Sequence, residues 1–370
     1  MTIYIFSILL LLLLSYLELT IAMSPATKKA ISLFVYVFLV LQVGLRWETG
    51  TDWNAYLQHF ESINSFSSAS PSLMSPEYGY NIAVWLVKIA FPNYSVFLLI
   101  HAAACFYLFF NSIKRYTGML FLPLMVFYCT TLISSTGANR QLIAVAIGFY
   151  ALRYIYEKKY TYFFLLVALA CMFHYSALIL LLFPLFNQKI RPVTLLLILV
   201  GSIALGATKL PLQLFSVIGN SLGELESTKV VADLGGSNSF LGSGLSIFGP
   251  VKRVVLLTLF LYNRRSLGEK LRYYNLMLNA YIAGVVIYVL FANSLLIIVS
   301  RGDMYFNIME PLLLASQVYL LKRRSNRLVM ASALCGLSFA LFLYSISPYR
   351  DLFVPYKGLI INTEYSRSMY

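Results

Sequence analysis

The sequence predicts an all-α fold, a polytopic transmembrane helical bundle of about 10–12 spans. Of the 370 residues, 60% are apolar and only 11% are charged, and the mean hydropathy is +0.77. Soluble domains contain about 25% charged residues, so this chain lacks the charge that a water-exposed surface needs. Its apolar residues fall in runs of about 17–26, the length that crosses ~30 Å of hydrocarbon as a helix. A soluble enzyme, a β-barrel, a secreted disulfide scaffold and a disordered chain are excluded.

Polar breaks divide the chain into apolar runs that we assign to spans. In chain order the runs are 3–22, 29–45, 79–112, 119–134, 140–156, 161–186, 193–208, 245–261, 273–298, 302–321 and 328–345. The run 79–112 is too long for one straight span, and Pro92 predicts a break in it. The run 161–186 carries His174, Tyr175 and Ser176 at its centre, so we expect it to be broken or re-entrant.

Charge gives the expected orientation. Lys plus Arg exceed Asp plus Glu by 28 − 14 = 14, which in a soluble chain would suggest a nucleic-acid partner. In a membrane protein the excess marks cytoplasmic loops, and we expect no nucleic acid. The strongest basic clusters are Lys158–Lys159, Arg264–Arg265 with Lys270 and Arg272, and Lys322–Arg324 with Arg327. If all three are cytoplasmic, an even number of crossings separates them, and this requires that 161–186 does not cross simply.

The remaining segments form one integral membrane domain, 1–370, with two outer loops, 46–78 and 209–245, and an outer tail, 347–370. The run Ile3–Leu17 lacks a basic start and is read as a retained first helix. The four cysteines lie inside apolar runs, so neither a disulfide nor a metal site is expected. The signatures of ATP-driven transport and of zinc proteolysis do not occur.

The first candidate site follows the second span. Arg46, Asp52, Trp53 and Tyr56 place a cation, a carboxylate and aromatic rings at the outer end of that span. Aromatic faces beside carboxylates hold sugars, because the ring stacks on C–H groups while the acid binds hydroxyls. The same pattern is also typical of an interfacial aromatic belt with a snorkelling arginine.

Two further arginines are expected at the same membrane face. Arg140 lies at the start of a helix, where free N–H groups and the helix dipole favour an anion. Arg301 follows the span 273–298. With Arg46 assisting, these guanidinium groups could form a pyrophosphate clamp. The alternatives are contacts with lipid headgroups for Arg140 and a weak surface pair with Asp303 for Arg301.

Other polar residues stand inside or beside spans. His174 lies mid-run next to Tyr175 and Ser176, where a packing role and a functional role are equally compatible with the sequence. Glu310 falls within the predicted span 302–321, so it needs a partner or a cavity. Lys357 adds a cation in the tail.

These pieces, in this order, resemble the EpsG-like branch of bacterial polysaccharide polymerases, within the broad Wzy or O-antigen polymerase group. The matching residues extend from about residue 40 to 360: Arg46, Gly50–Trp53, Tyr56, Phe60, Glu77–Tyr80, Asn139–Gln141, Ala144, Ala146, Phe173–Ala177, Arg301, Tyr305, Phe306 and Pro355–Lys357. One departure is that Trp47 and Glu48 stand where the family often has a second glycine.

The resemblance implies an inner-membrane glycosyltransferase related in architecture to the C-type glycosyltransferases. Such an enzyme transfers a growing glycan from a polyprenyl-pyrophosphate carrier to the next lipid-linked repeat unit, with its active site facing the periplasm. It implies neither cofactor nor metal. Donor and acceptor lipids are the expected partners, together with membrane lipid, and a chain-length regulator protein is a further candidate partner.

The needs of this reaction assign roles to the residues. Arg46, Arg140 and Arg301 are the candidates for binding pyrophosphate, and Asp52, His174 and Glu77 are the candidate bases for the acceptor hydroxyl. The candidates for other substrate contacts are Trp53, Tyr56, Gln141, Tyr305 and Lys357. A flippase for the same lipid-linked glycan is the main alternative, and a polysaccharide O-acyltransferase using His174 is a weaker one.

Overall fold

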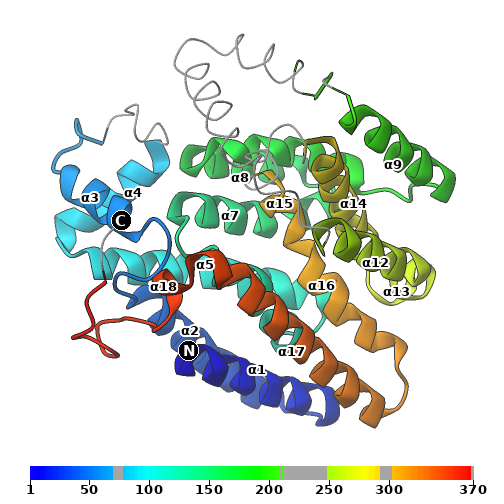
Figure 1. Ribbon diagram of the computed structural model, residues 1–370, viewed down its shortest axis with the longest axis horizontal. Helices are drawn as coiled ribbons and strands as arrows, with labels where there is room; N and C mark the ends of the chain where they lie inside the picture. The colour runs from blue at the N-terminus through cyan, green and yellow to red at the C-terminus, as the bar shows by residue number, and fades with distance from the viewer. Residues whose placement is uncertain (70–77, 209, 212, 214–247, 292–301, 368–370) are drawn as a thin grey trace. The chain divides into compact units, whose positions relative to one another are not determined.

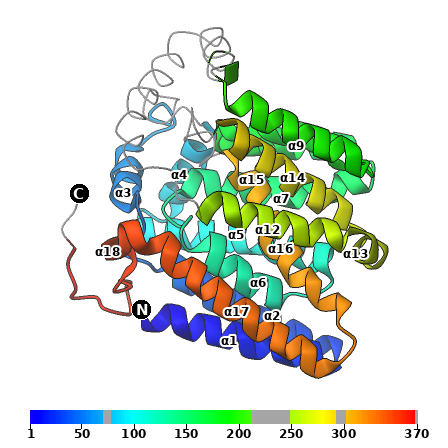
Figure 2. The same ribbon diagram turned by 45° about the vertical axis from the view of Figure 1, so that its right-hand side comes forward.

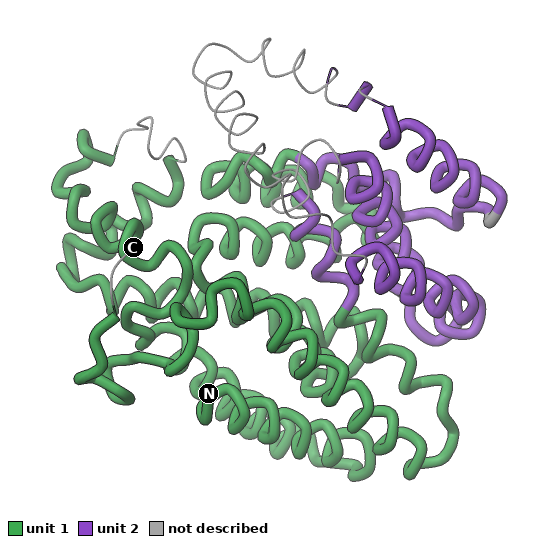
Figure 3. Tube along the Cα trace, viewed as in Figure 1, with its two compact units in different colours: residues 1–178, 311–370 green, residues 179–310 purple. Residues whose placement is uncertain are grey.

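The described part of the chain is helical throughout (Figure 1). The computed structural model describes residues 1–69, 78–208, 210–211, 213, 248–291 and 302–367. Within these ranges β pairing is limited to an isolated antiparallel bridge between Arg46 and Gly358. The chain forms two compact units, residues 1–178 with 311–370, and residues 179–310 (Figure 3). The predicted all-α class is confirmed.

Five helical segments are long and apolar enough to cross a membrane. They are α1 (Thr2–Thr20), α2 (Pro25–Gly44), α5 (Tyr94–Thr117), α14 (Tyr274–Phe291) and the segment Arg324–Phe353. Shorter apolar helices add to them: Phe121–Leu132, Tyr160–Phe173, Tyr175–Phe186 and Val193–Gly206. Large apolar side chains remain exposed on the span surfaces; Phe6 and Leu9 on α1, for example, are 55% and 57% exposed. Lipid covers such faces, so the protein is a polytopic helical membrane protein.

The first unit, residues 1–178 with 311–370, is a bundle built around α5 and α7. Helix α7 packs along α8 and α5, α2 packs along α5, and α1 packs against α6 and α17 (Figures 1 and 2). Besides α1, α2 and α5, its elements are α3 (Trp53–Ser62), α4 (Tyr78–Ala90), α6 (Phe121–Phe127), η1 (Tyr128–Leu132), α7 (Asn139–Tyr156), α8 (Tyr160–Phe173), η4 (Gln317–Leu320), α17 (Arg324–Ile346), η5 (Ser347–Tyr349) and α18 (Arg350–Phe353). Two elements contain residues of both units, η2 (Tyr175–Phe186) and α16 (Met309–Ser316).

Both predicted breaks in the long apolar runs are present. Helix α4 ends at Ala90 before Pro92, and Asn93 caps α5 by accepting the Ser95 N–H through its side-chain oxygen at 2.9 Å. Helix α8 ends at Phe173, and the extended backbone of the following His174 (φ −158°, ψ 124°) separates it from the 3₁₀-helix η2. The backbone at both places leaves helical geometry where the sequence is least apolar.

Polar side chains link helices inside the bundle of the first unit. Ser7 on α1 donates to the Gln42 side-chain oxygen on α2 at 3.0 Å, and the Gln42 amide donates to the Tyr128 hydroxyl at 2.7 Å. The Glu18 carboxylate accepts the N–H groups of Leu120 and Phe121 at the start of α6. Hydrocarbon offers no such partners, so these bonds fix how the helices pack.

Two of the predicted basic clusters lie at the same end of the helices of the first unit. Arg115 at the end of α5 pairs with Glu157 after α7, and Lys159 pairs with the same carboxylate at 3.0 Å. Tyr319, just before Lys322–Arg324, donates to the backbone oxygen of Thr117 at 2.8 Å. Two of the predicted basic clusters therefore share this end of the bundle, and the start of α7 at Asn139 lies at the opposite end of that helix.

The second unit, residues 179–310, is organised around α14. Helix α14 packs against α9 (Pro192–Gly206), α12 (Phe248–Tyr262), α13 (Arg264–Lys270) and α15 (Met304–Asn307). On α14, the Asn279 amide donates to the backbone oxygens of Phe186 and Gln188 at 2.8 and 2.6 Å. The third predicted basic cluster lies on and beside α13.

Candidate functional site

The site is built around a buried arginine at the end of α2. Arg46 is only 3% exposed. Its guanidinium donates to the backbone oxygens of Val43 and Thr136 at 2.7 and 2.8 Å, and to the side-chain oxygen of Asn139 at 2.7 Å. A buried guanidinium needs several acceptors, and these three come from α2 and from the start of α7. Arg46 therefore links the two helix ends.

Asn139, the first residue of α7, is held from further sides. Its backbone oxygen lies 2.9 Å from the Nε2 of His101 on α5. Its amide nitrogen lies 3.4 Å from the hydroxyl of Tyr94 at the start of α5. The amino end of α7 is thus fixed by α2 and α5, and the Arg140 N–H in its first turn donates to the Tyr56 hydroxyl at 3.4 Å. The helix dipole makes such an end attractive to an anion.

Arg140 stands next to this anchor and is half-buried. Its guanidinium lies over the ring of Tyr56 on α3, 5.7 Å from the ring centroid, and its Nε lies 3.4 Å from the Tyr56 hydroxyl. A guanidinium over an aromatic face makes a cation–π contact, which holds the Arg140 side chain against α3. Of the two predicted pyrophosphate ligands that the structure describes, Arg46 is buried and Arg140 is half-buried.

Helix α3 lies close to the start of α7 because two glycines touch. Gly50 adopts φ +111°, and a Cβ there would lie 3.3 Å from the Cα of Gly137. A Cβ on Gly137 would lie 2.7 Å from the backbone nitrogen of Thr51 and 3.2 Å from that of Asp52. The backbone of the exposed Asp52, at the start of α3, therefore lies close to the loop that leads into α7.

The face of α3 that carries Asp52 and Tyr56 also carries His59, one further turn along. His59 lies 2.9 Å from the side-chain oxygen of Asn81 and stacks on Tyr80. Burial, together with the nearby charge of Arg140, lowers the pKa of His59, although the hydrogen bond to Asn81 opposes this. The imidazole is thus neutral at pH 7.

Neither His59 nor Asn81 is among the residues that the sequence predicts for the site. The signal that could have found His59 is its spacing of seven residues from Asp52 on a helix. Asn81 offers no such signal, because it meets His59 only when α4 packs beside α3.

Three predicted substrate contacts are placed in the protein interior. Trp53 is buried, with its ring 5.7 Å from Tyr94 and 4.6 Å from Trp47. Tyr56, whose ring contacts Arg140, is buried, and Gln141 on α7 is buried as well. Trp53 belongs to the aromatic core beneath α3, which it shares with Phe60, Tyr80 and Phe97.

His174 lies at the end of α8. Its Nδ1 accepts the backbone N–H of Ser176 at 3.2 Å and lies 2.7 Å from the Ser176 hydroxyl. Because Nδ1 accepts, the neutral ring carries its proton on Nε2. Phe173, the preceding residue, packs against the aromatic core beneath α3, and a Cβ on Gly79 would lie 2.8 Å from Cβ of Met172. The end of α8 is therefore beside the start of α4, and the predicted base Glu77, just before α4, lies outside the described residues.

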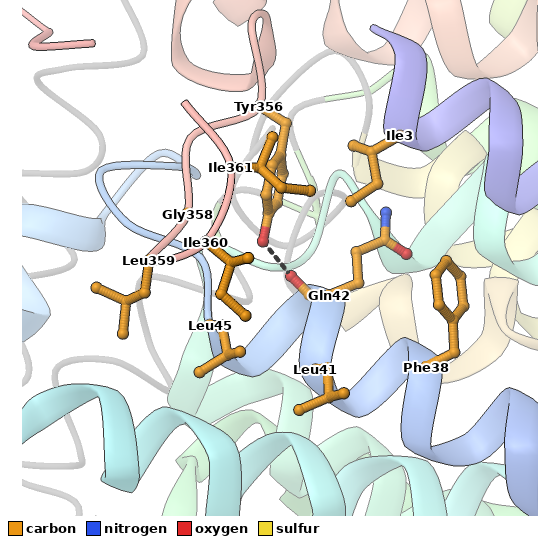
Figure 4. A pocket seen from close by; sticks show the side chains of 10 residues that line it. All are labelled: Ile3, Phe38, Leu41, Gln42, Leu45, Tyr356, Gly358, Leu359, Ile360 and Ile361. Carbon is orange, nitrogen blue, oxygen red and sulfur yellow. Dashed lines mark hydrogen bonds between the residues drawn. The ribbon is translucent and has the colours of Figure 1, made fainter. Parts of the chain in front are cut away.

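The C-terminal tail returns to the end of α2. Trp47 N–H donates to the Lys357 oxygen and Leu359 N–H to the Leu45 oxygen, both at 2.9 Å. The Tyr356 hydroxyl donates to the backbone oxygen of Gln42 at 2.6 Å (Figure 4). This contact borders an apolar pocket of about 140 Å³ lined by Ile3, Phe38, Leu41, Gln42, Leu45, Tyr356 and Gly358–Ile361.

An ion pair completes the attachment of the tail. Lys357 Nζ lies 2.7 Å from Glu48 Oε2, and both side chains are largely buried. Burial alone would raise the pKa of Glu48, but the Lys357 ammonium and the backbone N–H of Arg367 hold it below its ordinary value. Lys357, which the sequence predicts as a substrate contact, is paired with Glu48 in the structure.

The second unit holds a separate buried charge cluster. Asp303 is 1% exposed and pairs with Arg253 at 2.9 Å, and Asn307 donates to the same carboxylate at 2.6 Å. Arg253 also lies over the ring of Tyr288, 3.6 Å from its centroid. One alternative for Arg301 was a surface pair with Asp303. Asp303 is buried, so it does not form a surface pair. Arg301 itself lies outside the described residues, and Tyr305 is buried in this unit.

Glu310 has the partner that the sequence required. Its carboxylate lies 2.9 Å from Lys252 Nζ on α12. Among the described residues, no group of three or more His, Cys, Asp and Glu side chains could hold a metal ion. The side chains of the candidate site in the first unit are a half-buried guanidinium at a helix amino end, an exposed carboxylate and a neutral imidazole.

Comparison with known proteins identifies the family. Residues 29–358, nearly the whole chain, match the EpsG family, which comprises Wzy-like polysaccharide polymerases and EpsG glycosyltransferases. No curated protein and no solved structure matches the chain. The matched range includes Arg46, Arg140, His174 and Lys357, and it supports a role of the polysaccharide polymerase type. The chain belongs to the EpsG family.

Proposed function

We propose that this protein is the glycosyltransferase that joins polyprenyl-pyrophosphate-linked oligosaccharide repeat units into a bacterial surface polysaccharide. It takes the growing chain from one carrier lipid and places it on the next lipid-linked unit. The observation that carries the proposal is the position of Arg140, held over Tyr56 at the amino end of α7, with the backbone of Asp52 close to Gly137. Family membership supplies the reaction class, and this geometry supplies a half-buried cation near the start of α3.

The proposed reaction needs two kinds of help from the protein. The bond between the anomeric carbon of the donor sugar and the pyrophosphate oxygen breaks, and its electron pair leaves with the pyrophosphate. A base takes the proton of the acceptor hydroxyl, whose oxygen forms the new bond to the same carbon. Arg140 and the helix dipole at the amino end of α7 stabilise the departing charge. Asp52 is our first choice as base, and His174 and Glu77 are the other candidates.

Arg46 contributes by positioning. Its three hydrogen bonds fix the start of α7, so the direction of the Arg140 side chain depends on it. Arg301 remains the proposed second cation for the pyrophosphate. The activated donor carries the energy for the transfer in its phosphoester bond, so the proposed reaction uses no nucleotide and no cofactor.

The distribution of charge supports an outward-facing site in the inner membrane. Arg115 and Lys159 share one end of the first unit with the cluster Lys322–Arg324, and cytoplasmic loops of membrane proteins are enriched in Lys and Arg. The site at the start of α7 lies at the other end of that helix. The proposed site therefore opens to the periplasm, where lipid-linked repeat units are polymerised, and the carrier lipid reaches it from the bilayer.

The proposal is tested in cells that depend on this protein for their polysaccharide. We expect Arg140→Ala, expressed at the normal level, to abolish long chains on glycan gels, and Arg301→Ala to weaken them. Arg350→Ala, an arginine on α18, is the matched control and should leave the ladder unchanged. Long chains of normal abundance in both Arg140→Ala and Arg301→Ala would contradict the proposal. If the protein were a flippase, its inactive variants would no longer export repeat units. Inactive variants of a polymerase would instead leave single units at the cell surface.

A further inference from the structure

A second concavity in the first unit lies beside the proposed reaction site. It is a cleft of about 470 Å³ between α3, the turn that joins α4 to α5, and the C-terminal tail. Tyr94 lines this cleft with its ring, while its hydroxyl lies 3.4 Å from the Asn139 amide. The cleft and the reaction site thus share one wall.

The aromatic part of the cleft is rigid. Trp47 lines it and is held by its backbone N–H, which donates to the Lys357 oxygen at 2.9 Å. Its ring packs against the buried ring of Trp53, with 4.6 Å between centroids. An aromatic ring fixed in this way presents apolar area at little entropic cost, which suits the C–H face of a sugar ring.

The polar groups of the cleft favour a neutral, hydroxyl-rich ligand over an anion. Lys88 is the cation of the lining, and its ammonium already donates to the backbone oxygens of Phe60 and Glu61 and to the side-chain oxygen of Asn64, at 2.8, 2.9 and 2.9 Å. An ammonium has three N–H donors, so these bonds use all of them. A phosphate would find no donor left on Lys88.

Hydrogen-bonding capacity for hydroxyl groups remains at the rim. The side chain of Glu61 is exposed and offers carboxylate oxygens as acceptors. Asn93 also lines the cleft; its side-chain oxygen accepts the N–H of Ser95, and its NH₂ group is a donor for a hydroxyl group. Acceptor, donor and aromatic face together are the groups that recognise a saccharide.

The cleft is set apart from the reacting groups. Asp52 and Glu61 are nine residues apart at the two ends of α3, which at 1.5 Å per residue is a separation of about 13 Å along the helix. A saccharide bound at Glu61 therefore lies away from the bond that forms at Asp52. We propose that this cleft is a glycan-binding subsite that holds the oligosaccharide of a lipid-linked unit while transfer takes place beside Arg140. The inference rests on the proposed function and adds a site to it.

Binding tests the subsite independently of catalysis. The probe is a fluorescently labelled oligosaccharide prepared by partial hydrolysis of the host strain's own polysaccharide, titrated against the purified full-length protein. We expect Trp47→Ala to weaken binding about tenfold, the effect of losing one stacked aromatic contact. Glu61→Gln, an exposed position that leaves the fold intact, should also weaken binding severalfold. Phe91→Ala, an exposed aromatic residue beside the cleft that does not line it, is the matched control.

Chain extension separates this inference from the proposed function. With lipid-linked repeat units, Trp47→Ala and Glu61→Gln should still add units but release shorter chains, whereas Arg140→Ala should add none. Wild-type binding and wild-type chain length in both cleft variants would overturn the subsite while leaving the polymerase proposal in place. Displacement of the probe by phosphatidylglycerol, but not by unlabelled oligosaccharide, would also overturn it. Failure of the wild-type protein to extend repeat units would instead contradict the proposed function.

Discussion

The guanidinium of Arg46 donates to the side-chain oxygen of Asn139 over 2.7 Å, across 93 residues of sequence. This bond joins the end of α2 to the start of α7 and so positions the backbone next to Arg140. Arg46 is buried and Arg140 is half-buried, so the two arginines predicted to bind pyrophosphate differ in exposure. The difference between them can be measured.

Replacing Arg46 should damage the fold before it affects chemistry. Arg46→Ala leaves three buried oxygen acceptors without their donor, and each unsatisfied buried group costs about 1–3 kcal/mol. We therefore expect the free energy of unfolding of Arg46→Ala to fall by at least about 3 kcal/mol. Arg46→Lys should recover only part of it, because an ammonium lacks the planar fork.

The control for this prediction is Arg140→Ala. Its guanidinium is half-buried, so the unfolding temperature measured in detergent should stay near that of the wild type. Equal destabilisation by Arg46→Ala and Arg140→Ala would show that the two residues do not differ as described.

Gly137→Ala should separate α3 from α7. The added Cβ would lie 2.7 Å from the backbone nitrogen of Thr51, a distance that real Cβ atoms do not adopt, so the loop must move. We expect Asp52 to shift away from Arg140 and polymer synthesis to fall at least tenfold, on the order seen when a catalytic group is misplaced by about 1 Å. Gly336→Ala on α17 meets no atom within 4 Å and is the matched control. Normal glycan ladders in Gly137→Ala would argue against a site at this contact.

The charge of Arg140 should be detectable at His59. Burial and that charge both lower the pKa of His59, so Arg140→Gln should raise it toward the ordinary value of about 6.5. The chain has three histidines, so ring signals in ¹³C-histidine NMR can be assigned with His59→Gln. Because the folded pKa is the lower one, protonation favours unfolding, and native stability falls as the pH drops below about 6.5. An unchanged His59 pKa in Arg140→Gln would show that the guanidinium does not face α3.

Acid should release the C-terminal tail. Burial works against ionisation of Glu48, but Lys357 and the Arg367 N–H hold its pKa below the ordinary value. The stabilisation is therefore fully present above the ordinary glutamate pKa of about 4.3 and is lost as the pH falls through the lower pKa of the folded protein. We expect protease cleavage within the tail to rise on this acidic side in the wild type. In Glu48→Gln cleavage should already be raised at pH 7 and should vary little with pH, and a wild-type pH profile in this variant would contradict the role of the pair.

The stability contributions of Arg253 and Asp303, the buried pair in the second unit, should be coupled. Arg253→Met leaves the Asp303 carboxylate uncompensated and should cost about 3–5 kcal/mol of stability. The double variant Arg253→Met with Asp303→Leu removes both charges, and we expect it to recover most of that loss, as measured by thermal unfolding in detergent. Additive losses in the double variant would show that the two side chains do not depend on each other.

Much of the fold follows from local sequence. Runs of apolar residues predict the spans, and Pro92 and the polar centre at His174 predict the breaks, because each of these signals acts within a few residues. The need of Glu310 for a partner also follows from sequence alone, since a buried carboxylate must be paired. The identity of that partner, Lys252, does not follow, because it lies on another helix.

The site was harder to predict for the same reason. Nothing near Arg46 in the sequence shows that Thr136 and Asn139 will occupy its guanidinium. Likewise, the sequence alone does not show that Lys357 forms an ion pair with Glu48, because this contact requires the C-terminal tail to pack against the end of α2. Contacts between residues far apart in the sequence determine which charged side chains can contact a substrate. The sequence therefore predicts the candidate residues, but their roles depend on packing.

The most direct test of the account is chain extension by purified full-length protein supplied with lipid-linked repeat units in detergent. We predict that the wild type converts single units into a ladder, whereas Arg140→Ala, folded as judged by its unfolding temperature, leaves them single. Extension by Arg140→Ala at the wild-type rate would contradict the central claim that this guanidinium at the start of α7 stabilises the departing pyrophosphate.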